Sequence, residues 1–155
     1  MSELSEYRQK LIERLKQAAE EFSTACQKIQ SAYTSVPQSE WNVHQIAAHV
    51  VNVQSQVYGA RARRSAEEDN PIFQNFDADV WMAEHYDRSK SINQMLEGFN
   101  EQMSAFVSWL QELPLEAWSR ESRHETLGSG FTTQTWVERG LAHIEEHLAT
   151  VRKAP

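Results

Sequence analysis

The sequence predicts an all-α fold: a four-helix bundle with a long connection between the second and third helices. Four long stretches carry apolar residues at spacings of three and four, the pattern of an amphipathic helix with one buried face. Only five glycines and four prolines occur among 155 residues, so few positions interrupt these stretches. A chain of this length suits one hydrophobic core, and we expect a single domain over residues 1–155.

The first predicted helix covers residues 2 to about 33, and the second begins at Asn42. Pro37 interrupts the apolar pattern, and Asn42 followed by Gln45 is typical of a capping box at a helix start. The second helix extends to the polar segment 67–71. The predicted apolar face of the first helix consists of Leu4, Leu11, Leu15, Ala18, Phe22, Ala25 and Ile29, and that of the second of Ile46, Val50, Val53 and Val57.

The long connection and the third helix follow. The segment 71–90 is less regular, with a short helix expected over 77–86. Ser89 or Ser91 is expected to cap the third long helix, which ends at Pro114. The apolar face of this helix consists of Leu96, Phe99, Met103, Phe106, Val107 and Leu110.

The last helix is preceded by a short helical piece at 115–119 and by a loop at 124–133. Glycine and threonine dominate this loop, which has room for a brief extended part. Thr132 or Thr133 is expected to cap the final helix. Its inward residues are predicted to be Trp136, Val137, Leu141, Ile144, Leu148 and Val151.

Composition narrows the classes of function. A formal net charge of −7 argues against binding nucleic acid, which requires clustered basic residues. The cluster Arg61, Arg63 and Arg64 is the exception, and its place near a helix end favours a contribution to the helix dipole over an anion site. The single cysteine, Cys26, excludes an intramolecular disulfide, and we expect it to be a buried small hydrophobe in a cytoplasmic protein. No apolar run reaches the roughly 20 residues needed to cross a membrane.

Histidine spacing gives the main functional signal. His143 and His147 stand four apart, so both imidazoles face one side of the last helix and can hold one metal ion. At about 100° per residue they lie roughly 90° from the core direction of that helix. His49 lies about 60° from the core direction of the second helix and His44 roughly 160° away, so we expect His49 to face inward and His44 outward. Each histidine alone fits an ordinary helix residue, but three at the inner edge of the bundle indicate a metal site.

Such a site favours catalysis over a purely structural role. Three imidazoles leave coordination positions open, and a divalent ion lowers the pKa of a bound water or thiol. The segment HIEEH also matches the inverted zinc-peptidase pattern, with Glu146 as general base. Glu146 is expected to point to solvent, so this alternative is disfavoured, although Glu146 has the reach to contact His143.

Two segments, WNVHQIAAHVVNVQ (41–54) and GFTTQTWVERGLAHIEEHL (130–148), resemble the DinB-like superfamily, which includes YfiT-like proteins and thiol transferases that use bacillithiol. The shared order is a tryptophan opening the second helix, an inward histidine eight residues later, a long connection, a Gly-Thr loop and HxxxH on the last helix. The resemblance implies a metal-binding bundle with His49, His143 and His147 as the metal ligands.

The resemblance leads to one main hypothesis. We expect a divalent ion (Zn, Ni or Fe) to activate a low-molecular-weight thiol such as bacillithiol for transfer to an electrophile, at an opening framed by 67–90 and 124–133. The alternatives are a non-catalytic bundle that binds metal or a ligand, and a metal-dependent hydrolase. Small molecules are the expected partners, with no nucleic acid and no membrane, and a homodimer is compatible with the bundle.

Overall fold

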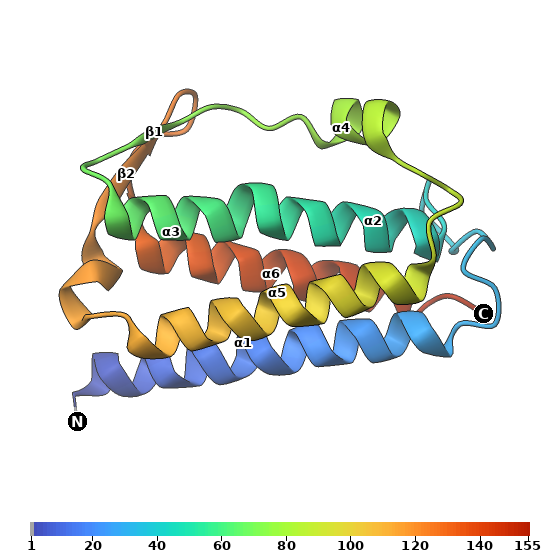
Figure 1. The fold of residues 1–155 in the computed structure, drawn as a ribbon, viewed down its shortest axis with the longest axis horizontal. Helices are drawn as coiled ribbons and strands as arrows, with labels where there is room; N and C mark the ends of the chain where they lie inside the picture. Colours follow the sequence, from blue (N-terminus) through green and yellow to red (C-terminus); the bar gives the residue numbers. More distant parts are fainter. Residues whose placement is uncertain (1) are drawn as a thin grey trace.

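The computed structural model describes residues 2–155, and its long helices lie side by side as a bundle with a small sheet at one end (Figure 1). The elements are α1 (Glu3–Lys28), α2 (Val43–Val53), η1 (Gln54–Gly59), α3 (Ala60–Glu67), β1 (Ile72–Phe73), α4 (Ala78–His85), α5 (Ile92–Glu112), η2 (Leu115–Ser119), β2 (Glu121–His124), β3 (Gly128–Thr132) and α6 (Thr133–Val151). The four members of the bundle are α1, the continuous run α2–η1–α3, α5 and α6. The predicted four-helix bundle is confirmed.

Local sequence sets the starts of the bundle helices. Asn42 and Gln45 form the predicted capping box at α2. Ser91 caps α5 by accepting a hydrogen bond from the Gln94 backbone N–H, and Thr132 caps α6 in the same way. These side chains satisfy backbone N–H groups that have no partner within their own helix.

The first helix is shorter than predicted. It ends at Lys28, and residues 29–42 form turns instead, with Val36 buried among them. Leu4, expected on the apolar face, lies in the first turn of α1 and is 48% exposed. The apolar periodicity of residues 2–33 therefore overestimates both the length of this helix and the extent of its buried face.

The prediction for His44 was wrong. This side chain is 1% exposed, because the turns after α1 and the chain after α4 cover the outer side of α2 at its first turn. Tyr33 stacks on the ring, and the two ring nitrogens contact the Tyr86 hydroxyl and the Lys90 carbonyl oxygen. A helical wheel locates only the bundle core and cannot include these two segments.

A π-helical turn interrupts the second bundle helix. Residues Gln54–Gly59 form η1, with α-helix on either side and no break in the chain direction. Glycine fits this turn, since a Cβ at Gly59 would lie 2.8 Å from the Gln54 carbonyl oxygen. Gly140 on α6 faces the same turn, where a Cβ would lie 3.0 Å from that of Tyr58. Gly59 thus relieves crowding within the turn, and Gly140 lets η1 and α6 approach closely.

The long connection and the predicted loop meet in a three-stranded sheet. β1 pairs in parallel with β2, and β2 pairs antiparallel with β3, so that Phe73 and His124 are partners. Ser122 joins the sheet to α6 by accepting a hydrogen bond from the Trp136 indole at 2.8 Å. The extended part expected within 124–133 is present. Among residues 2–155 no helix combines the length and apolar character that crossing a membrane requires.

Candidate metal centre

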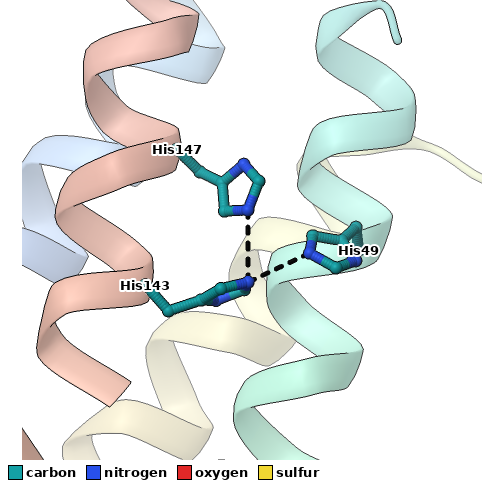
Figure 2. Close-up of side chains that lie close together, drawn as sticks. All are labelled: His49, His143 and His147. Atoms are coloured by element: carbon teal, nitrogen blue, oxygen red, sulfur yellow. Dashed lines mark hydrogen bonds between the residues drawn. The ribbon is translucent and has the colours of Figure 1, made fainter. Parts of the chain in front are cut away.

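The three predicted histidines come together between α2 and α6. Figure 2 shows the rings of His49, His143 and His147 turned toward one common point. The Nε2 atom of His143 lies 3.0 Å from that of His49 and 3.1 Å from that of His147. The three side chains also satisfy the geometry of a potential metal site, with ligand atoms within 4.8 Å of one another.

The helix packing explains this convergence. His143 and His147 are one turn apart on α6, and His49 reaches them from α2, which packs against α6. The rings meet edge to face, with centroids 4.5 to 4.9 Å apart. Trp41 stands against His49 on the side of the turns that precede α2. The site is therefore held by bundle helices and not by a mobile loop.

Burial keeps the three imidazoles neutral. Loss of solvent, with the neighbouring charge of His147, lowers the pKa of His49 to about 4. The same two causes and the charge of His49 lower the pKa of His143 to about 3, and burial lowers the pKa of His147. At neutral pH each ring thus has a lone pair available, which is the form that binds metal ions.

The donor set fits a divalent ion. An ion bonded to imidazole nitrogens at roughly 2.0 to 2.1 Å with tetrahedral angles holds those nitrogens about 3.3 Å apart. The two observed Nε2 separations, 3.0 and 3.1 Å, are close to this value. Three neutral nitrogen donors suit zinc, nickel or iron and leave coordination positions for a further ligand.

The Nδ1 nitrogens, which face away from the common point of the cluster, differ from those of most metal-binding histidines. The Nδ1 atoms of His49 and His143 are buried and have no hydrogen-bond partner among residues 2–155. Metal-binding histidines usually donate this N–H to a carboxylate or carbonyl group. Glu146, which the sequence offered as a partner for His143, is exposed and makes no hydrogen bond to that ring within the described residues. Its exposed position also disfavours the inverted zinc-peptidase pattern, in which Glu146 would act as general base.

A pocket of about 280 Å³ opens beside two of the histidines, His49 and His143. Residues Asn75 and Phe76 of the long connection and His124 and Leu127 of the sheet region line it, so both segments expected to frame the opening do so. Larger hollows of about 380 and 560 Å³ lie along α1, but no histidine lines them. The chemistry of the lining, and not the volume, identifies the smaller pocket as the candidate site.

Five polar residues of this pocket were not predicted as site residues: Tyr58, Arg61, Asn75, His124 and Arg139. Burial raises the pKa of Tyr58, while the charges of Arg139 and Arg61 lower it. Burial also lowers the pKa of Arg61 and of His124. Tyr58 and Arg61 are three residues apart, so helical spacing places both on one face of η1 and α3. This spacing is the sequence signal that would have found these two residues.

Cys26 lies away from this site. It is 2% exposed in α1, and burial raises the pKa of its thiol to about 12. The prediction that it behaves as a small buried hydrophobe is confirmed. No metal-binding or pocket role follows for this side chain.

Comparisons with known proteins agree with this architecture. The sequence model described as the DinB superfamily matches residues 3–151. Among solved structures, the chain resembles YfiT from Bacillus subtilis, described as a probable metal-dependent hydrolase with an unusual four-helix bundle topology. The TM-score is 0.85 at 18% identity, over 98% of this chain and 86% of YfiT. A comparison with curated proteins gives no match. At this identity the structural likeness establishes the fold alone.

Proposed function

This chain belongs to the DinB superfamily, and from that premise we propose that it is a metal-dependent thiol S-transferase. His49, His143 and His147 would hold a divalent ion of zinc, nickel or iron. A low-molecular-weight thiol such as bacillithiol would be one substrate and a small electrophile the other. The reducing cytoplasm, where such thiols are abundant, is the proposed location.

The observation that carries this proposal is the convergence of three Nε2 atoms from two bundle helices. Their low pKa values favour the neutral, metal-binding form at physiological pH. A divalent ion held there lowers the pKa of a thiol or water bound to it, which supplies a nucleophile near neutral pH. His49 and His143 also line the pocket, so the second substrate has access to the same place.

An external thiol is favoured because the protein has no suitable thiol of its own. Cys26 is the only cysteine, and its thiol is buried and stays protonated at neutral pH. In the proposed transfer, the thiolate sulfur forms a bond to an electrophilic carbon of the substrate. The bond from that carbon to the leaving group breaks, the leaving group takes the electron pair, and the thiol proton passes to solvent.

Hydrolysis is the second candidate. The likeness to YfiT, described as a probable metal-dependent hydrolase, favours it, and the same site would then activate water. A bundle that binds metal without catalysis is the remaining alternative. A homodimer stays a prediction in either case.

The first experiment measures metal content by elemental mass spectrometry, on protein purified without a histidine tag. We expect close to one ion per native chain and almost none in His147→Ala. His85→Ala is the matched control, because His85 is exposed on α4 outside the cluster. Absence of metal from the native chain, even after incubation with zinc or nickel, would contradict the proposal.

The second experiment separates the reactions. The metal-loaded protein is given 1-chloro-2,4-dinitrobenzene with and without a small thiol, and separately an activated ester without thiol. Turnover that requires the thiol and disappears in His147→Ala supports the transferase. Ester cleavage without thiol supports the hydrolase, and metal binding without either reaction supports the non-catalytic bundle.

A further inference from the structure

We propose that the pocket lined by His49 and His143 binds the carboxylate group of the substrate through Arg61 and Arg139. We call these two residues the arginine pair. The inference rests on the proposed function, since it names the class of molecule that the site accepts. Its evidence, however, is independent of the histidines: it concerns the charge and the hydrogen-bonding capacity of the pocket wall.

Arg61 is a buried cation without a counterion. Its side chain is 9% exposed, and one guanidinium nitrogen donates to the Gln74 carbonyl oxygen at 2.8 Å. The guanidinium stands over the rings of Phe73 and Trp136. No carboxylate of residues 2–155 forms an ion pair with it. A buried charge is costly unless an opposite charge accompanies it, so an anionic ligand is the expected complement.

Arg139 adds a second positive charge to the same wall. Its guanidinium carbon lies 5.9 Å from the centre of the Trp136 ring, over which Arg61 stands at 4.9 Å. Arg139 is exposed, and within the described residues its side chain forms neither a hydrogen bond nor an ion pair. Arg14, Arg64 and Arg152 each pair with a glutamate, whereas neither arginine of this wall does. Two neighbouring cations without a counterion therefore line this pocket.

The remaining polar wall also offers donors. His124 accepts hydrogen bonds at Nδ1 from the backbone N–H groups of Thr126 and Leu127, each at 3.2 Å. The proton of its neutral ring is therefore on Nε2, which makes that atom a donor. Tyr58 and Asn75 line the pocket too, and no aspartate or glutamate does. The wall thus combines positive charge with donors, and the complementary ligand is an anion.

A carboxylate fits this wall better than a phosphate. Guanidinium groups match the two oxygens of a carboxylate in a planar, bidentate arrangement. Phosphate sites typically add several backbone N–H groups at a helix N-terminus, whereas the residues named here offer side chains. Val53, Val57 and Leu127 supply apolar surface in the same pocket of about 280 Å³. We therefore infer a small, partly apolar carboxylic acid, with its carboxylate at the arginine pair.

The sequence favoured a different role for Arg61, as one of three cations at a helix end. Its two neighbours lie outside the pocket: Arg64 is exposed and paired with Glu68, and Arg63 stands over Trp109. Of these three adjacent arginines, only Arg61 lines the pocket. This division among adjacent arginines supplies a matched control for the test.

The test uses benzoate as the probe and benzamide as its neutral counterpart. Binding is followed by nuclear magnetic resonance titration of the full chain in metal-free and zinc-loaded forms. The metal-free form is essential, because a carboxylate can also bind zinc directly. We expect benzoate to bind the metal-free protein at least about 10-fold more tightly than benzamide, as charged hydrogen bonds contribute. Arg139→Gln should weaken benzoate binding by about 10-fold, and Arg63→Gln should leave it unchanged.

Three results would overturn the inference: equal binding of benzoate and benzamide, unchanged benzoate affinity in Arg139→Gln, or displacement of benzoate by inorganic phosphate at lower concentration than by acetate. Arg61→Lys provides a second variant that keeps the buried charge but loses the planar donor pair, and weaker benzoate binding is expected. If the native chain binds no metal while benzoate binding still depends on Arg139, the proposed function fails and this inference stands. If the native chain binds metal while benzoate binding does not depend on Arg139, this inference fails and the proposed function stands.

Discussion

Two buried histidines five residues apart on α2 illustrate how structural and functional roles differ. His44 is enclosed by Tyr33 and Tyr86, and both of its ring nitrogens have protein partners. His49 is also buried, but its Nε2 faces another histidine nitrogen and its Nδ1 has no partner. Both residues are buried, with exposed fractions of 1% and 8%, so burial does not identify the functional residue. The two residues differ in whether both ring nitrogens have hydrogen-bond partners, and this difference identifies His49 as the functional candidate.

The largest expected effect tests this difference through metal binding. His49→Ala removes one of three proposed ligands and should weaken zinc binding by more than about 100-fold, since even the outer partners of a ligand contribute 10- to 100-fold. His44→Ala, the same change on the same helix, should leave zinc affinity within about threefold. Equilibrium dialysis with a competing chelator measures both. Equal losses in the two variants would remove the distinction.

The next effect is on stability, and it runs in the opposite direction. In metal-free protein, His44→Ala should lower the free energy of unfolding by about 1 to 3 kcal/mol, because the Lys90 carbonyl and the Tyr86 hydroxyl lose the buried imidazole as their partner. His49→Ala should cost less, because no protein group bonds its Nδ1 and its Nε2 contacts only another imidazole. Urea denaturation of both variants at pH 7 decides the order. A greater loss in His49→Ala would mean that the cluster stabilises the fold without metal.

The smallest effect concerns pH. The pKa values of His49 and His143, about 4 and about 3, lie below the value of about 6.5 for an unfolded histidine. The unfolded chain therefore binds more protons than the folded chain as the pH falls below 6.5, so acid favours unfolding. We expect metal-free protein to lose stability progressively from pH 6.5 toward pH 4. Urea midpoints across this range measure the loss.

A matched variant identifies the source of that pH dependence. In His49→Gln/His143→Gln the two depressed pKa values are absent, so the decline between pH 6.5 and pH 4 should be shallower than in the native chain. An unchanged slope would assign the acid sensitivity to other groups. Zinc should oppose the native decline near neutral pH and lose this ability as protons compete for the imidazoles.

Much of the fold follows from local chemistry in the sequence. The capping box at Asn42, the caps at Ser91 and Thr132 and the apolar periodicity fix where the bundle helices begin and which faces they bury. The same periodicity places His143 and His147 on the edge of the core. These predictions succeeded because each depends on residues less than two helical turns apart.

The failures share a different cause. His44 is covered by Tyr33 and Tyr86, and Arg61 is oriented by Phe73 and Trp136, all of which lie at least eleven residues away in the sequence. The His124 tautomer depends on a turn that forms only where β2 and β3 pair. Helical geometry predicted the metal candidates because it could compare two helix faces. It could not predict the pocket, whose wall comes from the connections between helices.

The π turn gives the long second helix a further property, room for one additional residue. Residues Gln54–Gly59 lie between His49, in α2, and Arg61, in α3. Each residue of a π turn rotates the chain by roughly 80° instead of the 100° of an α-helix, so six residues there turn it about as far as five α-helical ones. Deleting one residue would therefore restore a regular α-helix and leave His49 and Arg61 at nearly the same angle to each other. The change would fall on the wall that Val57 and Tyr58 of this turn give to the pocket. A change of one residue in length would thus reshape the pocket while leaving the three histidines and Arg61 in place.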